Sequence, residues 1–536
     1  MRKEEQGREL RRSIYWTFIA ITMCIAAGRI CNVVSKEGDT AFLSANDRSR
    51  WCTVASLVDD GTYEIDRLVN LQNEKRRRPW NTIDKVRHRG ADAELHYYSS
   101  KPPLYPTMVA GVYAVIKTLT RMEITEQPIY VPRAILLIVN LPLLLLFCWS
   151  TIWAIDLICA DEWARRIVAA CTCFATMVFP FSITLNNHLP AAAATAFVMY
   201  MYILAAEKMD DRITGEQHRS HWLIWFATGA AAAFAAANEL PALSMLGLWF
   251  ILVLWLDWKS TQFFVSGVAI VAAAFFVTNS IAHESLRPPY AHRDNGEVIA
   301  ELESGAKPSI DAIAKVLIDA KLVYPDVDLK EEPSGEEGRT RLYTYDKLLF
   351  ALNRTGDEGP NAKWTLSHWD DWYDYPGSYW NDGKRRGVDL GEPSRLTYFA
   401  NMTIGHYGIF SITPIWILVP FGIYIGFSYG PREYTRLVIA IAIASIVCIA
   451  FYLMRPQIDR NYGGVSSCFR WVLWFAPLWL LVIAPAIQVC GDNIARRIAV
   501  IAFMCASIFS AAISLSSPWQ SPWIYRFWSF LGWIGN

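Results

Sequence analysis

The chain has 536 residues, of which 53% are hydrophobic, 14% aromatic and only 19% charged. Soluble globular domains carry about 25% charged residues, so this composition excludes an ordinary soluble protein and indicates a polytopic membrane protein. The 50 basic and 50 acidic residues cancel to a net charge of zero, which gives no electrostatic reason to expect a nucleic-acid partner.

The chain begins with a polar, basic segment, residues 1–12. An apolar run from Ser13 to Val34 follows without a small-residue cleavage site, which predicts an uncleaved first membrane span. Further apolar runs, each near the ~20 residues that cross a bilayer, complete a predicted set of about eleven transmembrane helices. These runs lie near 130–158, 165–183, 189–206, 222–238, 241–257, 263–281, 409–428, 435–453, 469–488 and 497–516.

Lysine and arginine in the short loops predict the orientation, because cytoplasmic loops carry an excess of both. With a cytoplasmic N-terminus, the five N-terminal cations are joined on the inner side by Arg165, Arg166, Lys208, Arg212, Arg219, Lys259, Arg432, Arg436, Arg496 and Arg497. Only Arg455, Arg460, Arg470 and Arg526 fall in short outer segments. One more crossing at 104–119 would reverse this asymmetry, so we expect an interfacial or re-entrant helix there, on the outer face.

Two large hydrophilic pieces, 35–103 and 282–408, both fall outside by this topology, and we expect them to pack on each other. The predicted organisation is a cytoplasmic tail and first span (1–34), an extracytoplasmic loop with interfacial helices (35–129), six transmembrane helices (130–281), a large extracytoplasmic aromatic and acidic loop domain (282–408), four transmembrane helices (409–516) and an interfacial tryptophan-rich C-terminal segment (517–536).

The second hydrophilic piece interleaves rings and carboxylates, as in Trp369-Asp370-Asp371-Trp372. Such rings stack on the apolar faces of sugars or lie at the level of lipid headgroups. Two interpretations are therefore equal alternatives. In one, Trp369 and Trp372 bind sugars; in the other, this piece forms a small soluble core with an aromatic belt. Among the 11 cysteines, Cys52 and Cys468 alone look able to meet an oxidising compartment, and their spacing does not by itself support a disulfide.

The first hydrophilic piece holds the candidate chemistry. Asp47 lies just beyond the first span and opens a segment with apolar residues at helical spacing, so we expect it at or just before a helix N-terminus. Capping of that helix is the structural alternative to a catalytic role. Lys101 precedes Pro102-Pro103 and the apolar segment 104–119.

The ordered set of these residues resembles the GT-C superfamily of integral-membrane glycosyltransferases, in particular the protein O-mannosyltransferase and lipid A aminoarabinose transferase group. The residues that carry the resemblance are Asp47, Arg50-Trp51, Gly61 with Tyr63, Lys101-Pro-Pro-Leu104 and Val131-Pro-Arg133, all in roughly the first half of the chain. The resemblance implies a GT-C-like fold and transfer of a sugar, with inversion, from a polyprenyl-phosphate-linked donor to an acceptor hydroxyl at the outer face of the membrane.

By the same resemblance, Asp47 is the catalytic aspartate that accepts the proton of the acceptor hydroxyl, and Lys101 contacts the donor phosphate. Arg133 and Arg470 are further candidates for binding that phosphate, with membrane anchoring as the alternative for each. The glycines before Arg470 permit close backbone approach.

The sequence departs from the family pattern in the second outer loop, where a further aspartate is often found and this chain has Asn186-Asn187-His188. His188 is a candidate contact for an acceptor or headgroup, and the alternative is a cap on the following helix. Glu239, in the third outer loop, is a candidate sugar or acceptor contact, and the alternative is a solvated loop tip.

No metal-ligand spacing or cofactor motif is recognised in the sequence, and a divalent metal requirement is left open. The predicted partners are a membrane lipid donor and a glycan, lipid or protein acceptor, with no oligomeric state predicted. Two other functions are compatible with the pattern. A transporter for a lipid-linked sugar would share the phosphate site without a base, and a non-catalytic scaffold would bind sugars through the aromatic loop.

Overall fold

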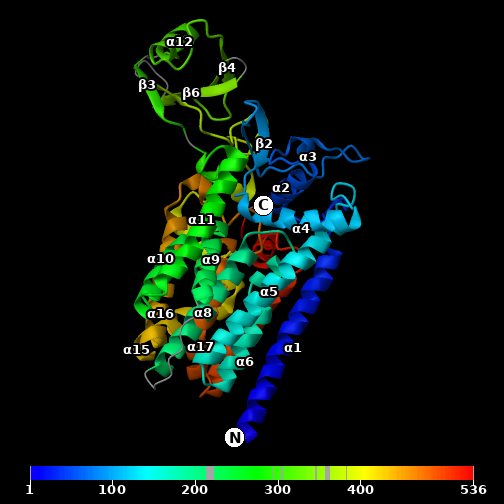
Figure 1. The fold of residues 1–536 in the computed structure, drawn as a ribbon, viewed down its shortest axis with the longest axis vertical. Coiled ribbons are helices and arrows are strands. Elements are labelled where there is room, and N and C mark those ends of the chain that lie inside the picture. Colours follow the sequence, from blue (N-terminus) through cyan, green and yellow to red (C-terminus); the bar gives the residue numbers. More distant parts are fainter. Residues whose placement is uncertain are drawn as a thin grey trace. The chain divides into compact units, whose positions relative to one another are not determined.

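The computed structural model describes residues 2–212, 222–293, 295–303, 306–344, 347–355, 362–381 and 383–534 (Figure 1). The chain divides into two compact units. The first unit comprises Met1–Asp47, Val112–Phe275 and Gly387–Asn536, and the second comprises Arg48–Gly111 and Phe276–Arg386. Arg219, one of the cations used to predict the topology, lies outside the described residues.

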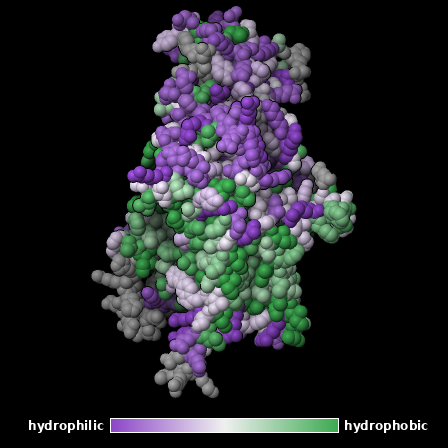
Figure 2. Space-filling model, turned by 90° about the vertical axis from the view of Figure 1, so that its right-hand side faces the viewer, coloured by the Kyte–Doolittle hydropathy of each residue, from purple (hydrophilic) through white to green (hydrophobic). Residues whose placement is uncertain are grey.

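Eight helices of the described chain are long and apolar enough to cross a membrane. They are α1 (Arg2–Asn32, apolar from Gln6), α5 (Tyr130–Ile158), α6 to α7 (Glu162–Phe181), α8 (His188–Arg212), α11 (Thr261–His283), α16 (Arg432–Met454), the 3-10 turn Arg470–Phe475 with α17 (Ala476–Cys490), and α18 (Ile494–Ser514). On the face drawn in Figure 2, hydrophobic residues gather over the helices and hydrophilic residues over the strands. The protein is therefore a mostly helical, multi-pass membrane protein.

Three shorter apolar helices coincide with the remaining predicted spans: α9 (Trp222–Asn238), α10 (Ala242–Leu256) and the segment Pro414–Tyr429, which ends in α15 (Leu418–Tyr429). At 10–17 residues they are shorter than the eight, so the count of about eleven crossing helices stays a prediction. Residue range 104–119 does form a helix, α4 (Leu104–Thr120), whose interfacial placement also stays a prediction.

Polar contacts fasten α1 to its neighbours at one end of the first unit. Arg11 Nε lies 2.8 Å from Asp156 Oδ1, and the Tyr15 hydroxyl donates to the same carboxylate at 3.0 Å. Arg11 also pairs with Glu162, at the start of α6. Asp156 is the charged residue that the sequence places near the end of a span, and these partners explain how its charge is tolerated there.

Small residues let α9 and α11 approach backbone to backbone. A Cβ atom added to Gly229 would lie 1.9 Å from the Phe264 carbonyl oxygen, and one added to Gly267 would lie 2.0 Å from that of Phe226. Membrane helices associate through such close contacts because lipid offers no hydrophobic driving force between them. We therefore expect neither glycine to accept a larger side chain.

The second unit contains a hairpin and a larger sheet. Strands β1 (Lys85–Arg89) and β2 (Leu95–Ser99) pair antiparallel. The five-stranded sheet has the order β3-β7-β6-β5-β4 and consists of β3 (Val298–Glu303), β4 (Leu329–Pro333), β5 (Arg339–Thr344), β6 (Lys347–Thr355) and β7 (Lys363–His368). Helix α12 (Ile310–Asp319) packs on this sheet through Ile313 and Leu317, which join the buried Leu342, Leu352 and Leu366.

The two hydrophilic pieces of the sequence pack together within this unit, as predicted. The Arg87 backbone N–H donates to the Trp372 carbonyl at 2.8 Å, and Trp380 Nε1 donates to the Ile83 carbonyl at 2.9 Å. The remaining elements of the unit are α2 (Ala45–Asp59, from Arg48 on), α3 (Asp66–Asn70) and the 3-10 turn Pro289–Ala291.

Short helices complete the C-terminal part of the first unit: Gly387–Leu390, α13 (Arg395–Thr403), α14 (Ile409–Ile412), Gln457–Asp459 and α19 (Trp523–Phe530). The tryptophan-rich C-terminal segment packs partly on the helices, since Trp523 Nε1 donates to Ser510 of α18 at 2.9 Å. Cys52 and Cys468 are both free and buried, and burial raises the pKa of Cys52 to about 12. No disulfide joins the two thiols.

Candidate functional site

Asp47 is the third residue of α2 rather than the residue that caps it. The Asp47 N–H donates to Ser44 Oγ at 3.1 Å, and Asp47 Oδ1 accepts the Ser44 N–H at 3.0 Å. This reciprocal pair is a capping box, in which two backbone donors of the helix start are satisfied together. Ser44 is thus the helix cap, and Asp47 lies in the first turn of the helix, three residues after the cap.

Asp47 has a further partner from a distant part of the chain. Its Oδ2 accepts the Leu43 N–H at 2.9 Å and the Thr184 hydroxyl at 2.7 Å. The Thr184 oxygen in turn accepts Trp519 Nε1–H at 3.1 Å. Asp47 is fully buried, so these donors, and not water, stabilise its carboxylate.

A break between two helices places Thr184 there. The π-helical turn Cys171–Ala175 and the four-residue α7 (Val178–Phe181) lead into an irregular stretch before α8 begins at His188. Asn140, fully buried within α5, donates through Nδ2 to the carbonyls of Ser182 at 2.8 Å and Thr184 at 3.0 Å. Since irregular backbone is tolerated at membrane depth only where its polar groups are satisfied, Asn140 supports this break.

His188, Glu239 and Arg470, three of the predicted site residues, form one buried cluster. His188 Nδ1 contacts Glu239 Oε1, and Arg470 Nη1 lies 2.5 Å from His188 Nε2. Arg470 has only donors, so the imidazole Nε2 must accept and Nδ1–H donates to Glu239. The side chains are 1%, 4% and 8% exposed, in that order.

Backbone geometry and a second amide complete this cluster. Asn187 Nδ2 donates to Glu239 Oε1 at 2.7 Å, and Arg470 Nε donates to the Gly463 carbonyl at 2.7 Å. Gly463 has φ +92, and a Cβ there would lie 2.3 Å from Arg470 Nε. The close approach expected of the glycines before Arg470 is therefore confirmed, and only glycine fits at residue 463.

Trp519 connects the cluster with Asp47. Its ring lies under the Arg470 guanidinium, with 5.0 Å between the carbon Cζ and the ring centroid, while its Nε1 donates to Thr184. A buried carboxylate and a buried guanidinium thus share one aromatic neighbour. The first unit brings Asp47, His188, Glu239 and Arg470 into one polar site at the ends of its helices.

Two structural alternatives are decided by this geometry. Glu239 is not a solvated loop tip, because it is buried and hydrogen-bonded. Arg133 Nε donates to the Val33 carbonyl at 2.9 Å, just beyond the end of α1. Arginine commonly satisfies the unpaired carbonyls of a helix end, so Arg133 has a structural role here, and its predicted phosphate contact lacks support.

Lys101 belongs to the second unit. Its Nζ lies 3.2 Å from Asp84 Oδ2, and its N–H donates to Ser99 Oγ. Its predicted contact with a donor phosphate stays a prediction.

The two tryptophans proposed to bind sugars are both engaged within the second unit. Trp372 is 8% exposed, stacks on His292 with ring centroids 3.5 Å apart and packs against His88 at 4.0 Å. Trp369 lies against the Arg339 guanidinium, 4.6 Å from its ring centroid. Burial lowers the pKa of His88 to about 4, so the His88 imidazole is neutral at physiological pH. The geometry favours a structural core over a sugar platform at Trp372.

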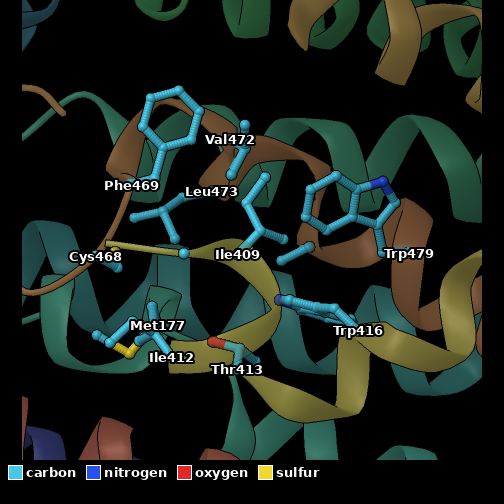
Figure 3. Close-up of a pocket in the computed structure, with 12 residues that line it drawn as sticks. Met177, Ile409, Ile412, Thr413, Trp416, Cys468, Phe469, Val472, Leu473 and Trp479 are labelled. Carbon is cyan, nitrogen blue, oxygen red and sulfur yellow. The ribbon is translucent and has the colours of Figure 1, made fainter. Parts of the chain in front are cut away.

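A narrow cavity lies in the first unit. Figure 3 shows its lining, which is mostly apolar and includes Phe469, Val472 and Trp416, with the Thr413 hydroxyl among the polar groups. Its volume is about 20 Å³, which is close to the space that one water molecule needs. It is too small for the chain of a carrier lipid in this conformation.

The sequence analysis missed Thr184, Trp519 and Asn140. Asn140 carried a signal, because a polar side chain inside an apolar run is costly and usually has a specific partner. Thr184 and Trp519 carried none, since a threonine near a span end and a tryptophan at an interface are both common.

Fold and site together define a polytopic helical membrane protein with a buried carboxylate, histidine and arginine site. No family model and no curated protein matches the chain. Among solved structures it is similar to the oligosaccharyltransferase of Archaeoglobus fulgidus in its apo form, with 11% identity and a TM-score of 0.44 over 97% of this chain and 57% of that one. The complex of that enzyme, AglB, with an inhibitory peptide and dolichol-phosphate gives 12% identity and a TM-score of 0.42. This chain thus spans little more than half the length of that protein.

Proposed function

We propose that this protein is a membrane glycosyltransferase that moves a sugar from a polyprenyl-phosphate carrier to an acceptor hydroxyl, with inversion. The observation that carries the proposal is the hydrogen bond from the Thr184 hydroxyl to Asp47 Oδ2 at 2.7 Å. This bond shows that a hydroxyl group can donate to Asp47 Oδ2. Asp47 is thereby arranged to accept a hydroxyl proton, as a general base requires.

The reaction requires few protein side chains. The acceptor oxygen forms a bond to the anomeric carbon as its proton passes to Asp47, and the bond from that carbon to the phosphate oxygen breaks. The electron pair leaves with the carrier phosphate, whose charge requires a cation opposite it. Arg470, buried and oriented by Gly463 and His188, is suited to this role because its planar donors match phosphate oxygens.

His188 and Glu239 hold Arg470 rather than react. Glu239 balances the guanidinium charge through the neutral imidazole, so the cluster carries no excess charge before the donor binds. Lys101 is the second candidate for the phosphate, from the sequence pattern. The sugar, the acceptor and any divalent metal requirement are outside this proposal.

The test is transfer of labelled sugar from a polyprenyl-phosphate donor in membranes that contain equal amounts of each variant. Asp47→Asn keeps the size of the side chain and should reduce transfer at least about 100-fold, the lower range for loss of a general base. Asp39→Asn, in the same loop before α2, is the matched control and should transfer normally. Transfer by Asp47→Asn at the wild-type rate would refute the assignment.

A transporter of lipid-linked sugar is the second candidate, since the cluster of His188, Glu239 and Arg470 would bind a phosphate without any base. Reconstituted vesicles separate the two functions. A transporter moves the labelled lipid between leaflets with Asp47→Asn as with the wild type, and it makes no glycosylated product.

A further inference from the structure

A second group of ionisable side chains lies in the second unit, apart from the residues discussed above. Glu64, on the loop into α3, and Asp66, the first residue of α3, face His96 of strand β2. One donor atom from each, Glu64 Oε2, Asp66 Oδ2 and His96 Nδ1, lies within 4.8 Å of the other two. All three side chains are partly exposed, so solvent reaches them.

The distances between these atoms suit shared coordination as well as a long hydrogen bond. His96 Nδ1 is 3.3 Å from Asp66 Oδ2 and 3.7 Å from Glu64 Oε2. A charge-assisted N–H···O bond is about 2.7–2.9 Å long. Two ligand atoms of a tetrahedral zinc ion, each about 2.1 Å from the metal, are about 3.4 Å apart.

The other nitrogen of His96 is already used. Its Nε2 lies 3.0 Å from Asp92 Oδ2, and a carboxylate accepts the ring N–H there. Nδ1, at the other edge of the ring, faces Glu64 and Asp66 and is the nitrogen left to bind an ion. Histidines that bind metals are oriented by a carboxylate in the same way.

The close ion pairs of the group involve a single imidazole. In the described part of the chain, Glu64, Asp66 and Asp92 form ion pairs with His96 alone, whereas the neighbouring Asp60 pairs with Arg67 at 2.9 Å. A divalent cation bound to Glu64, Asp66 and a neutral His96 would cancel both ligand charges.

We propose that Glu64, Asp66 and His96 bind a divalent transition-metal ion of the zinc type, with water in the fourth position. An imidazole ligand favours such an ion over magnesium or calcium, which prefer oxygen ligands alone. The ion joins the loop before α3 to the hairpin, where the Ile65 N–H already donates to the Tyr97 carbonyl at 2.8 Å. The site does not depend on the transferase activity.

The test uses the full-length protein in detergent, freed of metal by a chelator and titrated with Co²⁺ followed by visible absorption, then with Zn²⁺ by calorimetry. The wild type should bind one ion. His96→Gln and Asp66→Asn remove a ligand and should abolish saturable binding, while Asp92→Asn, which removes only the orienting carboxylate, should weaken binding about 10- to 100-fold. Asp60→Asn is the matched control and should bind like the wild type.

Thermal unfolding of each metal-free variant shows whether it is folded, and added Zn²⁺ should raise the Tm of the wild type but not of His96→Gln. Asp92→Asn keeps the test valid if a ligand variant fails to fold. Absence of stoichiometric binding by the wild type would overturn the proposal, because His96 would then be only an ion-pair partner. Unchanged affinity in His96→Gln would overturn it as well, by placing the ion elsewhere.

Discussion

Replacing Glu239 with Gln should destabilise the protein far more than loss of an exposed carboxylate, because it removes a buried negative charge that is linked to the buried Arg470 guanidinium through His188. Glu239 is 4% exposed and Arg470 8% exposed, so both charges have lost most of their water. Breaking a buried ion pair by removing one partner costs about 3–5 kcal/mol. We expect that range for Glu239→Gln and for Arg470→Gln alike, since each removes one of the two buried charges linked through His188.

A double-mutant cycle separates this electrostatic cost from lost packing. In Glu239→Gln with Arg470→Gln both charges are absent, so the double variant should be more stable than the sum of the single losses predicts, by about 1–3 kcal/mol. Equilibrium unfolding in mixed micelles, followed by tryptophan fluorescence, measures all four proteins. Glu126→Gln, at an exposed position of the same unit, is the matched control and should change stability by less than about 0.5 kcal/mol.

Two results would refute the reasoning. Additivity of the single variants within about 0.5 kcal/mol would mean that the charges do not interact through His188. A loss below about 1 kcal/mol in Glu239→Gln would mean that water reaches the cluster, as it does at exposed ion pairs.

Three further predictions concern single residues. Thr184→Val keeps the shape but removes the donor to Asp47, which should cost about 1.5–3 kcal/mol of unfolding free energy and reduce transfer, while Thr184→Ser should restore both. Asn140→Leu leaves the Ser182 carbonyl without its side-chain donor, while the Thr184 carbonyl keeps Asn186 Nδ2. It should cost about 1–3 kcal/mol in the same unfolding assay, and a stable variant would refute its supporting role. Burial lowers the pKa of His88 to about 4 from 6.5. Between these two pH values the His88 side chain is therefore protonated in the unfolded chain but not in the folded protein. Stability should then drop by about 3 kcal/mol between pH 6.5 and 4. The other titratable imidazoles near His88 are those of His283, His292 and His96. His88→Gln should show a correspondingly flatter stability profile.

The helices were predictable because hydropathy is a local property. The predicted run 222–238 matches α9 in both bounds, and 130–158 matches α5, since each run ends where polar residues resume. The break before His188 was predicted only as a short loop. Its π-helical turn depends on Asn140 and on packing against α5, which local pattern does not encode.

The sequence predicted which residues belong to the site better than it predicted what each residue does there. Glu239, His188 and Arg470 were each singled out as charged or polar residues near span ends, yet nothing in the sequence paired them. Arg470 and His188 are 282 residues apart along the chain. Their contact follows from which helix ends meet, and that depends on interhelical packing.

The sequence by itself determined that this is a multi-pass membrane protein, where its apolar helices run, and that a carboxylate lies just beyond the first span, because composition and periodicity act over a few turns of chain. Only the tertiary structure decided that Asp47 meets Thr184, 137 residues away, and that Thr184 meets Trp519, 335 residues away. The physical reason is that a buried polar group must find a partner wherever packing brings one, and sequence distance plays no part in that requirement.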